Sequence, residues 1–123
     1  MNIKKVKNSI EELKNDLDDA LIMTDIYTSG DGESLAGYNT QTKACVSFSK
    51  VTNLIFQGLK ESNFPELCNF YLVNLVNNFI LIVLPLDEYQ WIMLIDSSKA
   101  PLGLLLNIIL PKTVESFEEA IRE

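Results

Sequence analysis

The strongest candidate for a chemical site is the glycine-rich, acidic stretch TSGDGESLAGYN at residues 28–39, with Asp25 just upstream. Glycine-rich loops bind phosphate groups when they lead directly into a helix, as in the GxGxxG and P-loop motifs. Here Leu35 stands where the third glycine belongs, and Lys43 lies too far along the chain to serve a P-loop. A strand rather than a helix is expected to follow. The stretch therefore does not match a nucleotide-binding loop.

The same acidic residues could instead bind a metal ion. Counted from Asp25, a calcium loop needs an oxygen ligand at position 3 and a glutamate at position 12, but these positions hold Tyr27 and Ala36. A looser set of Asp25, Asp31 and Glu33 is the alternative. A tight turn explains the composition better, because glycine adopts positive φ and Asp and Ser hydrogen-bond to turn backbone. We predict a β-hairpin turn here and no metal site.

Groups for catalysis are scarce elsewhere. The absence of histidine removes Ser-His-Asp and Cys-His sites and most zinc sites. Cys45 and Cys68 fit no metal-binding spacing and are expected to be free, half-buried thiols. Asp96 is expected to cap a turn, and Tyr89 and Trp91 to lie in the core rather than line a pocket. The other acidic residues considered are expected to be solvated: Asp87, Glu88, Glu115, Glu118 and Glu119. We predict a non-enzymatic protein without catalytic residues or a cofactor.

Length and charge narrow the class further. The 123 residues match the commonest domain size, and 47% of them are hydrophobic, so one domain spanning residues 1–123 with a packed core is expected. The net charge of −7 argues against nucleic acid and anionic membrane partners, which bind Lys and Arg. No apolar run approaches the ~20 residues of a membrane-spanning helix, and the first residues lack the apolar segment of a signal peptide. We expect a cytoplasmic protein.

Hydrophobic periodicity predicts the elements that must position any site. Apolar residues at intervals of three and four predict an amphipathic helix from Ile3 to Leu17, capped by Asn2. A second helix is expected from a Thr40 or Thr42 cap to about Ser62. The last helix begins at Pro101 and is expected to continue through a kink at Pro111. Strands are expected at residues 20–26, 34–38, 67–76, 79–84 and 91–95.

The strand sequences predict how these elements are layered. Short connections force antiparallel neighbours, and Asn77-Asn78 suits a tight hairpin. The runs FILIVL and WIMLI are apolar on successive residues, so both faces of those strands are buried and helices must cover both sides of the sheet. We predict an α/β (α+β) fold: a three-layer sandwich around a five-stranded antiparallel sheet, in the order α-β-β-α-β-β-β-α.

The second helix is more apolar than one sheet face requires. Ala44, Phe48, Val51, Ile55 and Leu59 form its main stripe, and an adjoining stripe includes Cys45 and Phe56. The strand at residues 67–76 is interrupted by asparagines, as suits an exposed edge, and exposed edges invite pairing with another chain. We therefore predict a two-fold homodimer. Its interface is expected to contain Cys45, Ser49, Thr52, Phe56, Phe70, Leu72 and Asn74.

The element order and several motifs resemble the roadblock / dynein light-chain superfamily, in its bacterial or archaeal form. The segment ALIMTDIYTSGDGESLAGYN is similar to its strand, acidic glycine turn and short second strand, with Leu35-Ala36-Gly37 as the small-residue motif. The segments FILIVL and WIMLIDSSKAPLGLLLNIILP are similar to its central strands and to the start of its third helix at Leu102-Gly103. The resemblance covers essentially the whole chain. The first hairpin turn is a few residues longer than is usual in the superfamily.

The resemblance implies a profilin-like sandwich that dimerises through paired second helices and joined edge strands. It also implies a non-enzymatic partner of a small Ras-like GTPase that modulates the nucleotide cycle of that GTPase. Several bacterial relatives act without inserting an arginine, which fits a chain whose only arginine is Arg122, beside the C-terminus. The alternatives are a self-assembling scaffold without a GTPase partner and, third, an enzyme or ligand sensor with a pocket near Trp91 and Asp96.

Overall fold

The computed structural model describes the whole chain, Met1–Glu123, and has the predicted order of elements. The helices are α1 (Ile3–Leu17), α2 (Thr42–Glu61), α3 (Leu102–Leu104) and α4 (Leu110–Arg122), with a π-helical turn, η3 (Leu105–Ile109), between the last two. The strands are β1 (Leu21–Thr28), β2 (Ser34–Tyr38), β3 (Tyr71–Asn74), β4 (Phe79–Leu86) and β5 (Tyr89–Asp96). Two short 3-10 turns, η1 (Asp18–Ala20) and η2 (Val76–Asn78), precede β1 and β4.

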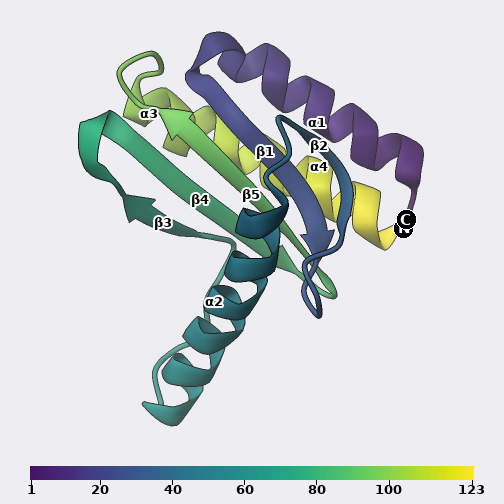
Figure 1. Cartoon of the computed structure of the whole chain (residues 1–123), viewed down its shortest axis with the longest axis vertical. Helices are drawn as coiled ribbons and strands as arrows, with labels where there is room; N and C mark the ends of the chain where they lie inside the picture. Colours follow the sequence, from purple (N-terminus) through teal and green to yellow (C-terminus); the bar gives the residue numbers. More distant parts are fainter.

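The five strands form one antiparallel sheet in the order β2-β1-β5-β4-β3. Helices α1 and α4 lie behind this sheet in Figure 1, and α2 lies in front of it. Alternate side chains of the central strands point to opposite faces. Trp91 and Met93 join the large core under α1 and α4, whereas Ile92 joins a smaller core under α2. The predicted three-layer α+β sandwich is confirmed.

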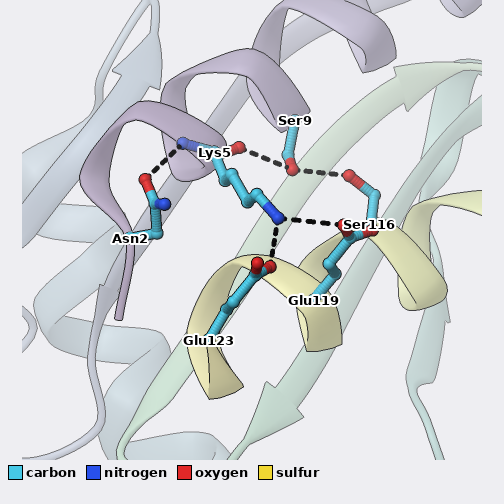
Figure 2. Close-up of polar contacts among 6 residues, drawn as sticks. All are labelled: Asn2, Lys5, Ser9, Ser116, Glu119 and Glu123. Carbon is cyan, nitrogen blue, oxygen red and sulfur yellow. Dashed lines mark hydrogen bonds and ion pairs between the residues drawn. The ribbon is translucent and has the colours of Figure 1, made fainter.

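Helices α1 and α4 cover one sheet face as a pair. Figure 2 shows polar contacts in and between them, involving Asn2, Lys5, Ser9, Ser116, Glu119 and Glu123. The Asn2 side chain accepts a hydrogen bond from the Lys5 backbone N–H at 3.2 Å, so the predicted cap is confirmed. The Ser9 and Ser116 hydroxyls lie 2.5 Å apart in the contact between the helices. These contacts fix how the two helices sit against each other.

The C-terminal helical segment is continuous through Pro111, as predicted. Proline lacks an N–H and its ring clashes with the carbonyl four residues earlier. The chain accommodates this with the wider turn η3, in which the Leu110 N–H donates to the Leu105 carbonyl five residues before it. Leu105 and Ile109 are buried, and Ile108 between them is 61% exposed. No helix of the structure combines the length and apolar character needed to cross a bilayer.

Two predictions of element boundaries were wrong, and the two free cysteines are not half-buried as expected, because Cys45 is buried and Cys68 is exposed. The edge strand is shorter than expected, because only Tyr71–Asn74 pair with β4 and the residues before them run outside the sheet. Helix α2 is preceded by Gln41, whose side chain makes no capping hydrogen bond, so neither threonine caps it. The predicted hairpin at Asn77-Asn78 is confirmed, with φ values of 62° and 66°.

Candidate functional site

The glycine-rich stretch that first suggested chemistry forms a self-contained turn between β1 and β2. The Thr28 N–H donates to the Glu33 carbonyl at 3.0 Å, and the Gly32 N–H donates to the Thr28 carbonyl at 2.9 Å. The Asp31 carboxylate accepts from the Thr28 hydroxyl and from the Glu33 N–H. These bonds lower the pKa of Asp31, which therefore stays ionised and serves the turn. The predicted hairpin turn is confirmed.

The two glycines of this turn have different roles. Gly32 has φ of +74°, and a Cβ placed there would lie 2.6 Å from Cα of Val46 and 2.7 Å from the Cys45 carbonyl oxygen. A side chain at Gly30 would meet nothing within 4 Å. Only Gly32 is therefore required, and the reason is the close approach of the turn to the first turns of α2.

Asp25, considered above as a metal ligand, lies in the protein interior with 0% exposure. Its Oδ1 accepts a hydrogen bond from the Ser34 hydroxyl at 2.6 Å, and its Oδ2 has no hydrogen-bond partner. A Cβ at Gly37 would lie 2.5 Å from Oδ2 and 2.7 Å from the Thr40 hydroxyl oxygen, so the glycine makes room for this group. Nowhere do three or more acidic or cysteine side chains converge as metal ligands.

Desolvation determines the protonation of this buried acid. Burial raises the pKa of Asp25, against the opposing effect of the Ser34, Thr40 and Cys45 side chains. Burial and the nearby Asp25 also raise the pKa of the Cys45 thiol to about 12, so Cys45 is an inert core thiol. Through its hydrogen bond with Ser34, Asp25 of β1 holds β2 to the central sheet. This role could not be predicted from the residues alone, because a polar residue in an apolar strand can equally well lie at the surface.

The aromatic residues near the other candidate acid are structural. Trp91 is fully buried, and its indole N–H donates to the Thr24 hydroxyl at 2.6 Å. Its ring packs edge-on against Phe117, with centroids 5.4 Å apart. Asp96 accepts hydrogen bonds from the Ser98 N–H at 3.0 Å and from the Ser98 hydroxyl at 2.6 Å. Trp91 therefore belongs to the core and Asp96 caps a turn, as the sequence predicted.

Helix α2 carries four of the seven residues predicted to form a dimer interface. The helix turns three of these four residues toward the sheet of its own chain instead of toward a partner. Cys45, Ser49 and Thr52 are its buried residues, each 1% exposed or less. They face the sheet of the same chain: the Gln90 amide donates to the Ser49 carbonyl at 3.5 Å, and the Thr52 hydroxyl lies 2.6 Å from that of Tyr71. The helix thus packs through its small polar stripe, which allows close approach to the sheet.

Phe56 continues this same helical face, since positions 45, 49, 52 and 56 repeat at intervals of four and three. It is nevertheless 41% exposed, because the C-terminal half of α2 projects past the sheet (Figure 1). A hollow of about 620 Å³ lies beside this overhang, with Phe56, Leu59, Phe64 and Leu67 among its lining residues. Leu54 and Val51 are also exposed. The overhanging half of α2 therefore leaves apolar side chains without cover from the chain itself.

The other three predicted interface residues lie at the edge strand. Strand β3 pairs with β4 alone, so its outer backbone edge is open. Leu72 pairs with Ile82, and directly paired residues share a face, so Leu72 lies on the side of α1 and α4. Asn74 shares that face, and Phe70 packs against the same core.

The seven residues therefore do not form one surface. Cys45, Ser49 and Thr52 are covered by the sheet of their own chain, which corrects their placement on an exposed stripe. Phe56 overhangs on the α2 side of the sheet, and Leu72 is 37% exposed on the opposite side. The interface itself stays a prediction, with Phe56 and the open edge of β3 as its accessible parts.

Comparison with known proteins places this arrangement in a fold group. No protein-family model and no curated protein matches the sequence. MglB of Myxococcus xanthus superposes with a TM-score of 0.78 at 11% identity, over 98% of this chain and 93% of MglB. A Roadblock/LC7 domain from Streptomyces avermitilis gives 0.67 at 10% identity, over 95% and 98%. An MglB with tetrameric arrangement gives 0.66 at 14% identity, over 96% and 90%. The chain has the roadblock fold, which confirms at the level of fold the resemblance seen in the sequence.

Proposed function

We propose that this chain, which has the roadblock fold, is a self-associating and non-enzymatic regulator that binds a small Ras-like GTPase and modulates its nucleotide cycle. The observation that carries the proposal is the likeness to MglB and to a Roadblock/LC7 domain over nearly the whole of each chain. The proposed unit is a single roadblock-like domain of residues 1–123, acting in the cytoplasm. Its partners are a second copy and the GTPase.

The surface of α2 supports the self-association in this proposal. Phe56 and Leu54 are 41% and 64% exposed on a helix that projects beyond its own sheet. Burying a large apolar side chain is worth about 1.5–3 kcal/mol, so covering several of them favours association. One of the structural neighbours is an MglB in a tetrameric arrangement, so this fold does associate in at least one other protein.

The only arginine bears on how a GTPase would be affected. Arg122 pairs with Asp87 through two hydrogen bonds of 3.2 Å, between the last turn of α4 and the β4–β5 turn. That pairing also raises the pKa of the guanidinium. An arginine engaged in its own chain suits a regulator that orders the catalytic groups of the GTPase itself, rather than one that inserts an arginine.

A binding and turnover experiment tests the proposal. Each small Ras-like GTPase encoded in the same genome is loaded with GDP or with a non-hydrolysable GTP analogue and titrated with the purified chain. The expected result is saturable binding that depends on the nucleotide, together with a changed rate of single-turnover GTP hydrolysis. Absence of binding to every such GTPase would refute the proposal.

A charge substitution tests the α2 contact separately. Phe56→Asp places a carboxylate in the proposed interface, where burial of an unpaired charge is costly, so the dimer is expected to dissociate into monomers. Ser47→Asp is the matched control, because it adds the same charge at an exposed position on the opposite side of α2. Light scattering on both variants gives the mass. A dimer that survives Phe56→Asp would show that association uses another face.

A further inference from the structure

A second set of exposed apolar side chains lies away from α2. It consists of Leu75 and Val76 at the β3–β4 turn and Leu102, Leu104 and Ile108 on α3 and η3. Their exposures range from 39% for Leu75 to 81% for Val76. We call these five residues the apolar end of the molecule.

The two segments of the apolar end are held together by the fold. The Ser97 N–H and hydroxyl both donate to the Asn78 carbonyl, at 2.8 and 2.6 Å, and so join the β3–β4 turn to the loop that leads into α3. In Figure 1 this turn and α3 lie at the same end of the sheet, while the C-terminal half of α2 projects from the other end. The apolar end is therefore a surface separate from the α2 contact proposed above.

The apolar end is also the part of the chain without charge. Residues 67–86 and 100–111 contain no Asp, Glu, Lys or Arg, although 22% of the whole chain is charged. At its rim, Lys99 and Asp19 lie 4.0 Å apart as an ion pair, so the nearest charges offset each other. Natural proteins usually protect exposed edge strands with charged residues or prolines, and β3 has neither.

The charge pattern decides which occupant fits this surface. In a contact across a two-fold axis each residue near the axis faces its own copy, so any charge there would face a like charge. Two chains of net charge −7 repel each other and can meet closely only where the surface is neutral. A charged partner protein would instead need complementary charges, and the apolar end offers none. The surface suits a second copy of this chain.

We propose that the apolar end is a self-association contact, distinct from the α2 face, through which two copies of the chain meet. Together with the α2 contact it would carry assembly beyond the dimer, since one chain would then present two different self-complementary faces. The proposal does not depend on binding of a GTPase.

The test is the mass of the full chain in solution over a range of concentrations, by light scattering and sedimentation velocity. Ile108→Asp is expected to halve the mass of the largest species and to raise the dissociation constant of that step at least tenfold. Leu102→Asp is the second variant, because an acidic residue in the first turn of a helix is compatible with folding. Ile3→Asp is the matched control: Ile3 is 46% exposed on α1, and its mass is expected to stay that of the natural chain.

Salt distinguishes this contact from an ionic one. Raising the salt concentration to about 0.5 M screens the repulsion between the two acidic chains, so the larger species is expected to increase. Circular dichroism shows that each variant is folded. The proposal is overturned if Ile108→Asp and Leu102→Asp both leave the mass unchanged, or if salt dissolves the larger species. Phe56→Asp reports on the α2 contact alone, so failure of one contact leaves the other testable.

Discussion

Replacing Asp25 with asparagine tests the interpretation of this residue as a buried structural acid whose pKa is raised by desolvation. The carboxyl group is fully buried, accepts one hydrogen bond from Ser34, and has no cation beside it. Asparagine has the same shape and cannot ionise. Its carbonyl can keep the bond from Ser34, and its amide can donate toward the Thr40 hydroxyl beside the present Oδ2. Asp25→Asn is therefore expected to stabilise the protein at neutral pH.

The expected size follows from two costs that the substitution removes. A buried polar atom without a partner costs about 1–3 kcal/mol. Burial also raises the pKa of Asp25 above its unfolded value of about 3.9, so the folded state holds a proton that the unfolded state has released. Stability from this group is fully present below pH ~4 and falls by up to ~1.4 kcal/mol per pH unit until the folded pKa is passed. We expect a gain of about 1–3 kcal/mol at pH 7, or roughly 3–10 °C in Tm.

The assay is urea unfolding of both proteins between pH 4 and pH 8. The advantage of the asparagine variant should grow as the pH rises from 4 and then level off. Asp31→Asn is the contrasting variant: hydrogen bonds lower the pKa of Asp31, so its stabilisation is lost only below about pH 4, and the difference between this variant and the natural protein should stay nearly constant from pH 4 to pH 8. The reasoning is refuted if Asp25→Asn is less stable than the natural protein at pH 7, or if their difference does not change with pH.

Two further predictions concern packing. Gly32→Ala forces a Cβ to 2.6 Å from Cα of Val46 at positive φ and is expected to cost about 2–4 kcal/mol, whereas Gly30→Ala in the same turn should cost less than about 0.5 kcal/mol, as measured by urea unfolding. Phe117→Ala removes a side chain that is 2% exposed and packs on Trp91, and is expected to cost about 3–5 kcal/mol; a melting temperature within a few degrees of the natural protein would contradict this.

The order of elements could be predicted from the sequence because each carries a local signal. Apolar residues at intervals of three and four predicted α1, and Asn2 supplies its cap as expected. Successive apolar residues in β4 and β5 predicted strands buried on both faces, and these strands lie inside the sheet between β1 and β3. The predictions of where β3 begins and ends and of which residue caps α2 were wrong. Strand pairing and hydrogen-bond geometry determine those boundaries, and residue types alone predict them poorly.

The candidate interface shows where sequence reasoning is limited. Periodicity placed Cys45, Ser49, Thr52 and Phe56 on one side of α2, and the structure agrees on that grouping. Three of them are nevertheless buried and Phe56 is exposed, because periodicity gives the angle of a side chain about the helix axis and says nothing of where the sheet beneath ends. The sheet ends before it reaches Phe56, so Cys45, Ser49 and Thr52 are buried against the sheet and Phe56 is exposed.

Residue types and their spacing were enough to predict the types of element, the antiparallel order of the strands and the burial of the central strands on both faces, and residues 67–86 and 100–111 contain no charged side chain. These properties depend on residue type and short-range spacing. The three-dimensional arrangement was needed to learn that Asp25 is buried with one oxygen unpaired, that α2 overhangs its sheet, and that the β3–β4 turn is hydrogen-bonded to the loop after β5. Each of these depends on how segments distant in the chain pack together, and residue type and short-range spacing do not encode that packing.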